Sequence, residues 1–237
     1  EAGSSSTWLS EHLSELESMT LVSVVNQTSG RGQRGNSWEA GPGKNLTVSL
    51  LWKPEAFPAI VQFAASEAVA PAVADTLADY GIEARVKWPN DIYVGDRKIC
   101  GILIENSVCG RNIESAVCGI GLNVNQTEFL SDAPNPVSML QLLGRETPLD
   151  EVLERLCGHL ERRLAAVSDL STHSALQDEY MSRLWRGDGK FHPFHDALAD
   201  EDIEAAILAV APIGTLTLLL PDATTRSYAF KEVSFIL

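Results

Sequence analysis

The sequence is poor in positive charge, with 18 Lys and Arg against 32 Asp and Glu and a formal net charge of −14. Proteins that bind nucleic acid need a basic face, because contacts to phosphates supply much of their affinity. The charge balance therefore predicts that nucleic acid is not a partner. An anionic ligand would need cations gathered locally, and such cations lie in one third of the chain: Arg31, Arg34, Lys44, Arg85, Lys87, Arg97 and Lys98.

Long apolar runs and paired cysteines are also missing. No apolar run reaches the ~18 residues that span a bilayer, and the first residues, EAGSSSTWLSEH, hold no basic segment followed by an apolar one. We therefore expect no membrane segment and no signal peptide. The four cysteines form no C-x-x-C pair and no zinc-site spacing, which predicts free thiols in a cytoplasmic protein. They are Cys100, Cys109, Cys118 and Cys157.

What is present is the composition of a globular enzyme, with 45% hydrophobic and 21% charged residues in a chain of 237. Apolar spacing predicts helices over residues 6–18, 59–81, 149–167 and 171–185, with Ser6 as the N-cap of the first. Alternating or β-branched runs predict strands over residues 21–25, 45–52, 84–88 and 114–125, and a hairpin over residues 91–108. A change in composition near residues 185–189 divides the chain into residues 1–186 and a small β-barrel-like piece, residues 187–237.

The segment GRGQRG fits the pattern G-x-G-x-x-G at Gly30, Gly32 and Gly35. A dinucleotide-binding fingerprint needs a helix directly after the glycines, but here NSWEAGPGK and a predicted strand follow. A loop between strands with two arginines instead suits a phosphate or a carboxylate. The alternative is a solvent loop whose arginines bind nothing. Trp38, just after the loop, either stacks on a flat ring or anchors the loop by packing.

A second dense segment is KWPNDIYVGDRKICGILIE, residues 87–105. Strand alternation predicts that Lys98, Cys100 and Ile102 share one face and that Arg97, Ile99 and Gly101 share the other. A lysine among apolar neighbours is costly to bury unless it meets an anion, so Lys98 is either a ligand contact or an ordinary solvated lysine. In GIGLNVN, the carboxamide of Asn123 needs partners, either an adenine edge or a neighbouring backbone group.

Together these segments resemble the biotin protein ligases. QTSGRGQRGNSW is similar to that family's biotin- and nucleotide-binding loop, KWPNDIYVGDRKICGILIE to its KWPND hairpin, and GIGLNVN to its next strand motif. The resemblance implies an α+β fold, in which a mixed, largely antiparallel sheet with flanking helices is related to class II aminoacyl-tRNA synthetases. A small C-terminal SH3-like β-barrel would follow. Since the chain starts at the catalytic part, we expect the form without an N-terminal DNA-binding domain.

The resemblance also implies the chemistry. Biotin and ATP would form biotinyl-5′-AMP with the help of Mg²⁺, and a lysine of a biotin carboxyl carrier protein, or of a carrier domain of a carboxylase, would then take the biotinyl group. The implied catalytic residues are Arg31, Lys87, Asp91 and Lys98. The implied biotin-binding residues are Ser6, Thr7, Gln27, Gly30, Arg31, Gly32, Gln33, Lys98 and Gly101. The implied adenylate-binding residues are Arg31, Arg34, Trp38 and Asn123. The metal ligands stay undetermined, and a homodimer is possible.

Three residues depart from the family pattern. Trp8 stands where many members have Asn, and Gln33 and Asn36 stand where well-studied bacterial members have Arg. We therefore expect a weaker hold on the adenylate. The alternatives are a lipoate–protein ligase or related acyl transferase on the same fold, and a binding module without catalysis; the retained Arg31 and Lys98 argue against the second.

Overall fold

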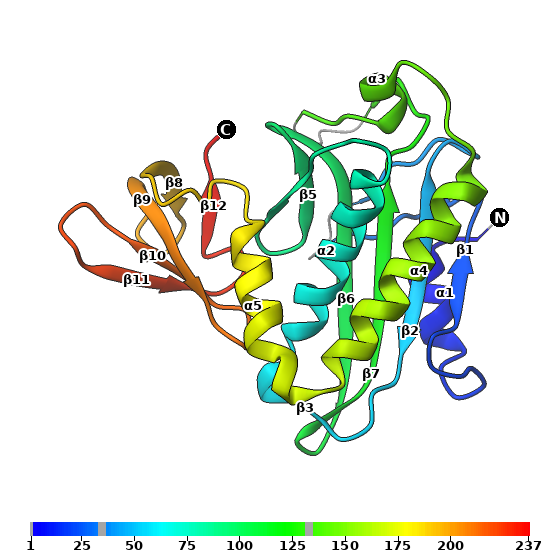
Figure 1. Ribbon diagram of the computed structural model, residues 1–237, viewed down its shortest axis with the longest axis horizontal. Helices are drawn as coiled ribbons and strands as arrows, with labels where there is room; N and C mark the ends of the chain where they lie inside the picture. The colour runs from blue at the N-terminus through cyan, green and yellow to red at the C-terminus, as the bar shows by residue number, and fades with distance from the viewer. Residues whose placement is uncertain (1, 33–36, 131–134) are drawn as a thin grey trace.

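The computed structural model describes residues 2–32, 37–130 and 135–237, and its larger unit is an antiparallel sheet (Figure 1). Among the described residues this sheet has seven strands in the order β1-β2-β7-β6-β5-β4, with β3 pairing with β7. The strands are β1 (Leu21–Ser23), β2 (Leu46–Trp52), β3 (Phe57–Pro58), β4 (Arg85–Lys87), β5 (Asp91–Val94), β6 (Arg97–Cys109) and β7 (Asn112–Leu122). Strand β2 is buried along its whole length, because both faces of the sheet are covered there.

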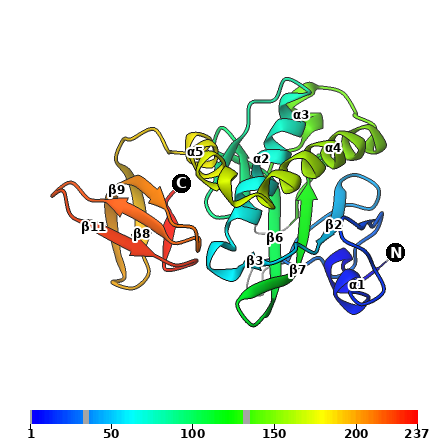
Figure 2. The same ribbon diagram turned by 60° about the horizontal axis from the view of Figure 1, so that its bottom comes forward.

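Helices cover the two faces of the sheet unequally (Figure 2). One face carries α1 (Ser5–Glu11) as its only α-helix in the described part of the chain, and this helix packs Leu9 against Leu51 and Val117. The other face carries α2 (Ala64–Ala78). Helices α4 (Leu149–Val167) and α5 (His173–Ser182) pack against α2. The other helices within the described residues are the 3-10 turns Ala59–Val61 and Leu170–Thr172 and α3 (Met139–Leu143). The main core lies between the sheet and α2, whose alanines allow a close approach.

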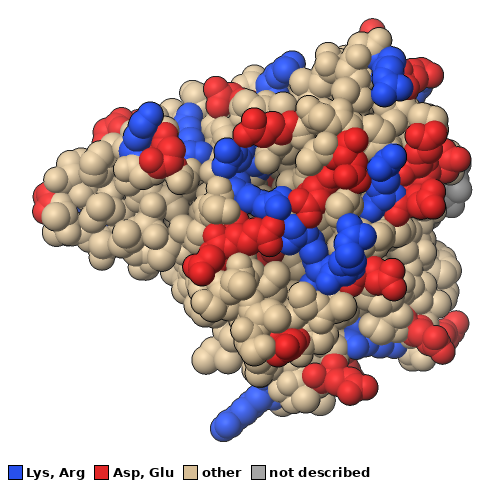
Figure 3. Space-filling view, viewed as in Figure 1, with Lys and Arg blue, Asp and Glu red and all other residues tan. Residues whose placement is uncertain are grey.

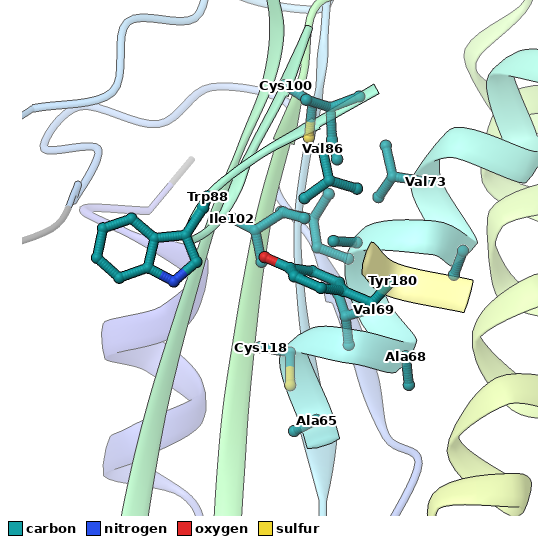
Figure 4. Packing of buried hydrophobic residues seen from close by; sticks show 14 of the residues in the cluster. Ala65, Ala68, Val69, Val73, Val86, Trp88, Cys100, Ile102, Cys118 and Tyr180 are labelled. Atoms are coloured by element: carbon teal, nitrogen blue, oxygen red, sulfur yellow. The ribbon is translucent and has the colours of Figure 1, made fainter. Parts of the chain in front are cut away.

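Figure 4 shows this core, with Cys100, Ile102 and Cys118 of the sheet on the side that faces Val69 and Val73 of α2. On the outer side, positive and negative side chains alternate over the helices (Figure 3). Asp75 of α2 accepts hydrogen bonds from Arg163 of α4 at 2.6 Å and Arg183 at 2.6 Å. These guanidinium groups hold the pKa of Asp75 below its usual range despite its partial burial. The ion pairs therefore fix three helices relative to one another.

The prediction for the first helix is wrong in its bounds. Helix α1 begins at Ser5, with Ser4 as its N-cap, and ends at Glu11 rather than near residue 18. After Glu11 the chain is no longer helical, and a distant side chain binds its carbonyl groups. Lys53 donates from Nζ to the carbonyl oxygens of Leu13 (2.7 Å) and Leu16 (2.6 Å). An ammonium therefore satisfies two carbonyl groups of the non-helical segment that follows α1.

The hairpin predicted over residues 91–108 is present as β5–β6, and it turns at Gly95, which has a positive φ of 58°. Its side-chain alternation is not the predicted one. Ile92 pairs with Cys100 but Tyr93 pairs with Lys98, so Ile99 is an extra residue that forms a β-bulge. Cys100 and Ile102 consequently enter the core, while Lys98 turns to the opposite face, where Gly101 also lies.

The C-terminal residues form a second antiparallel sheet, which has five strands among the described residues in the order β11-β10-β9-β8-β12. The strands are β8 (His192–Asp196), β9 (Glu201–Val210), β10 (Leu216–Leu219), β11 (Thr225–Tyr228) and β12 (Val233–Phe235). The β-rich character predicted after residue 187 is confirmed. Trp88 Nε1 donates to the carbonyl oxygen of Gly214 at 3.1 Å, which ties this sheet to the larger unit. In the described ranges no helix is both long and apolar enough to cross a membrane.

Candidate functional site

A pocket of about 150 Å³ lies on the α1 face of the sheet. Its floor comes from the paired strands β6 and β7, and its walls from the start of α1, the loop before β2, and the β4–β5 connection. The predicted site residues that line it are Ser6, Gln27, Arg31, Gly32, Trp38, Asp91, Lys98 and Gly101. Segments separated by up to about half of the sequence are therefore brought together, as the motifs predicted.

Glycines make the floor of this pocket flat. Gly101 of β6 is paired directly with Gly121 of β7, and the Trp38 indole lies over both. A Cβ at Gly119, one pleat away, would come within 2.6 Å of Ser6 Oγ. Side chains at these positions would displace the Trp38 indole or the Ser6 hydroxyl, so the glycines allow these two pocket residues to lie directly on the sheet. Gly30 packs against the Trp38 backbone, where a Cβ would clash, and so fixes the loop.

Serine and glutamine side chains form one end of the pocket. The Ser5 amide donates to Gln27 Oε1 at 3.1 Å, and Ser6 Oγ lies beside this pair on the same wall. Thr7 is half-buried and does not line the pocket. Trp8 lies outside it too, stacked on His12 with a ring separation of 4.2 Å. This end therefore offers uncharged hydrogen-bonding groups.

Charged residues form the other end. Lys98 Nζ lies 2.7 Å from Asp91 Oδ1, and the two side chains are 21% and 24% exposed. Arg31 donates to Glu105 at 2.6 Å. Both cations are thus positioned by carboxylates and remain partly open to the pocket. An entering anion would meet two positive groups held in place beforehand.

Lys87 is the predicted catalytic residue that does not reach the pocket lining. Its Nζ donates to the Tyr93 hydroxyl at 3.2 Å and lies over the rings of Tyr93 and Phe235. Burial lowers the pKa of this amine, and the charge of nearby Asp91 opposes that effect. Lys87 of β4 is the cross-strand neighbour of Asp91 of β5, so it borders the charged end of the pocket without lining it.

A second, smaller pocket adjoins the first and shares Trp38 and Lys98 with it. Asn123, only 3% exposed, lines this pocket and donates from Nδ2 to the carbonyl oxygen of Val137 at 3.1 Å. Its Oδ1 has no hydrogen-bond partner among the described residues, and neither has Trp38 Nε1. An unpaired acceptor and an unpaired donor, both buried, suit the hydrogen-bonding edge of a heterocyclic base.

Some predicted site residues lie outside the described residues, and some residues that line the pocket were not predicted. Gln33, Arg34 and Asn36 lie outside the described residues. Ser5 and Gly119 line the pocket without having been predicted. The alternation of small residues in GIGLN, which places Gly119 and Gly121 on one face, was the available signal for the floor.

Comparisons with known proteins agree with this geometry. A model of the biotin/lipoate A/B protein ligase family matches residues 3–123. The chain is 30% identical over 234 residues to the bifunctional ligase/repressor BirA of Salmonella typhimurium, covering 98% of this chain and 71% of that protein. It is 30% identical over 154 residues to the biotin–[acetyl-CoA-carboxylase] ligase of Mycobacterium tuberculosis, covering 63% of this chain and 55% of that one.

The fold is also that of solved structures. The biotin protein ligase from Aquifex aeolicus in complex with biotin and ATP matches with a TM-score of 0.80 at 22% identity, covering 99% of this chain and 95% of that one. At this level of identity the likeness establishes the fold alone. It confirms the predicted α+β class, with antiparallel sheets and flanking helices.

Proposed function

Because the chain belongs to the biotin/lipoate A/B protein ligase family, we propose that it is an ATP-dependent ligase that joins biotin to a lysine of a carrier protein. The curated relatives above are a ligase/repressor and a biotin–[acetyl-CoA-carboxylase] ligase. The carrier we propose is accordingly a biotin carboxyl carrier protein or the corresponding domain of a carboxylase.

The observation that carries this proposal is the order of chemical groups along the two pockets. Neutral hydrogen-bonding groups at Ser6 and Gln27 come first, Arg31 and Lys98 come next, and the unpaired Oδ1 of Asn123 comes last. Biotin has a neutral ureido ring at one end and a carboxylate at the other, and the adenylate adds a phosphate and a purine. The order of groups in the ligand matches the order of groups in the protein.

In the first step, a biotin carboxylate oxygen attacks the α-phosphorus of ATP, and the bond to pyrophosphate breaks. The difficulty is the approach of two anions. Lys98 and Arg31 lower it, because their charges face the place where carboxylate and phosphate meet. Both are ion-paired before the ligand arrives, which holds them in position with little reorganisation.

In the second step, the carrier lysine attacks the acyl carbon of biotinyl-5′-AMP, an amide bond forms, and AMP leaves with the electron pair of the broken C–O bond. The attacking amine must also lose a proton. Asp91 is the carboxylate on the pocket wall beside Lys98, so it is placed to orient this amine. Lys87, the cross-strand neighbour of Asp91, does not line the pocket, so its role is to add positive charge beside Asp91 rather than to touch the ligand.

Mg²⁺ stays a prediction from the family resemblance. Within residues 2–32, 37–130 and 135–237, no three His, Cys, Asp or Glu side chains lie close enough together to hold a metal ion. The described side chains therefore form no metal cage. A Mg²⁺ ion carried by nucleotide phosphates needs only one or two protein carboxylates, and neither step above passes through it.

The test is to incubate the protein with ATP, Mg²⁺, biotin and a biotin carrier domain and to read the carrier by mass spectrometry. We expect one added biotinyl group on one lysine and biotin-dependent exchange of pyrophosphate into ATP. Lipoate in place of biotin tests the alternative ligase, and a carrier modified only with lipoate would decide for it. Binding of biotin without pyrophosphate exchange would identify a module that does not catalyse.

A further inference from the structure

Behind the neutral end of the pocket lies a buried hydroxyl that does not itself line the cavity. Ser49 of β2 is 0% exposed, and its Oγ lies 2.8 Å from Ser5 Oγ and 2.9 Å from Ser6 Oγ. Gly119 is paired with Ser49 across the strands, and only a glycine leaves space there for Ser6 Oγ. The packing therefore links three hydroxyl groups, those of Ser5, Ser49 and Ser6, into one hydrogen-bonded chain.

A backbone amide fixes the direction of this chain. The Ser5 N–H can only donate, so the atom of Gln27 that faces it at 3.1 Å is the carbonyl oxygen Oε1. Ser5 Oγ also donates to this oxygen, at 3.4 Å. Gln27 therefore accepts from both polar groups of Ser5, and its Nε2 remains the donor of the amide.

Each hydroxyl has a single proton to donate. If Ser6 donates to Ser49, Ser49 to Ser5, and Ser5 to Gln27, every proton of the chain has an acceptor. In the opposite direction Ser5 donates to Ser49 and Ser49 to Ser6, so the Ser6 proton has no acceptor within the chain and Gln27 loses one bond. The first order forms one more hydrogen bond among three serines that are each at most 6% exposed, and it therefore prevails.

We propose that Ser49 is a positioning residue that sets the hydrogen-bond polarity of the pocket: it makes Ser6 Oγ an acceptor beside the donor Nε2 of Gln27. An acceptor next to a donor complements a cyclic urea, which offers an N–H next to a C=O. A dithiolane ring offers neither group. Ser49 thus selects a cyclic urea, and this inference rests on the proposed function, deepening it to the choice between biotin and lipoate.

The first experiment measures biotin binding by titration calorimetry in the whole chain and in three variants. Ser49→Ala is expected to raise the Kd for biotin about tenfold, the effect of one neutral hydrogen bond, and to leave the KM for ATP unchanged. Ser49→Thr keeps the hydroxyl and should recover most of the lost affinity. Ser115→Ala removes another buried serine from β7, away from the pocket, and serves as the matched control.

The second experiment tests the polarity with cyclic carbamate analogues of biotin, in which an oxygen of similar size replaces one ureido N–H. The analogue that places this oxygen at Ser6 should bind the wild type at least about tenfold more weakly than biotin, since two acceptors then face each other. Ser49→Ala frees the Ser6 proton, so it should reduce that penalty.

An unchanged Kd for biotin in Ser49→Ala, a parallel loss for biotin and ATP, or a carbamate penalty that is the same in both proteins would each overturn the role of Ser49. These outcomes leave the proposed function standing, provided that the wild type biotinylates the carrier. Failure of the wild type to bind biotin or to modify the carrier would instead refute the proposed function.

Discussion

Glu67 tests how burial of a carboxyl group changes its protonation and, with it, the stability of the fold. This carboxyl lies on α2 in the main core, is 4% exposed, and its Oε1 has no partner among the described residues. Burial raises its pKa from the ordinary value of 4.5 to about 7. The folded protein therefore binds a proton at Glu67 that the unfolded chain releases between these two pH values.

The sign and size of the effect follow from this difference. Below pH 4.5 Glu67 is protonated in both the folded and the unfolded state, and its contribution to the free energy of unfolding is fully present. As pH rises towards 7, this contribution is lost. Above pH 7 the loss no longer changes with pH. At about 1.4 kcal/mol for each pKa unit, the free energy of unfolding falls by ~3 kcal/mol over this window. Glu67→Gln keeps the shape of the side chain and cannot ionise, so it should remove this fall.

The assay is urea unfolding of wild type and Glu67→Gln at several pH values from 4.5 to 8.5. We expect the two proteins to be similar at pH 4.5 and the variant to be more stable by ~3 kcal/mol at pH 8. Titrations elsewhere, such as that of Asp75, affect both proteins and cancel in the difference. Glu154→Gln, at an exposed position of α4, removes the same formal charge and reports the effect of net charge alone. A difference between wild type and Glu67→Gln that is the same at every pH would refute the reasoning.

Three further predictions concern the ligand site. Lys98→Ala should lower biotin-dependent pyrophosphate exchange ~10²–10³-fold with an unchanged circular dichroism spectrum, since one preorganised charge is lost; near-normal exchange would contradict this. Biotin and ATP together should raise the melting temperature by more than the sum of their separate effects, because the loop around Arg31 is ordered only once; strictly additive shifts in differential scanning would argue against it. Gln33→Arg and Asn36→Arg should slow release of biotinyl-5′-AMP, by ~10-fold for a charge-assisted phosphate bond; unchanged dissociation rates would show that neither position contacts the adenylate.

Local sequence patterns predicted the elements whose stability is local. Helix α4 spans the residues expected from its apolar spacing, with Leu156, Leu160 and Leu164 on the buried face. Helix α3 was missed although its capping box, Ser138 with Gln141, was visible in the sequence. The segment after α1 could not be predicted in the same way, because the ammonium that binds its carbonyl groups belongs to Lys53, which is distant in the sequence.

The residues of the site likewise divide into those that sequence motifs predicted and those that only the fold brings together. Residues within the motifs, such as Gln27 and Asn123, were predicted because the family resemblance names them, and the structure brings them to adjoining pockets. Ser49 belongs to none of the quoted motifs and was not predicted. Its importance arises from contacts with Ser5 and Ser6, more than forty positions away, and only the fold creates them.

The bulge at Ile99 shows how one extra residue connects the fold to the site. Strict alternation would have placed Lys98 beside Cys100 and Ile102 in the core under α2, where an unpaired ammonium is very costly. Two consecutive apolar residues after Lys98, both 0% exposed, were the sequence signal that alternation fails there. The bulge lies in the β5–β6 pairing and turns Lys98 into the pocket. On the other edge of β6 the regular β6–β7 register continues, and the Asn123 amide donates to the carbonyl oxygen of Ile99 at 2.9 Å. The residue of the bulge thus borders both the cation that meets the carboxylate and the strand end that carries the carboxamide proposed to meet the base.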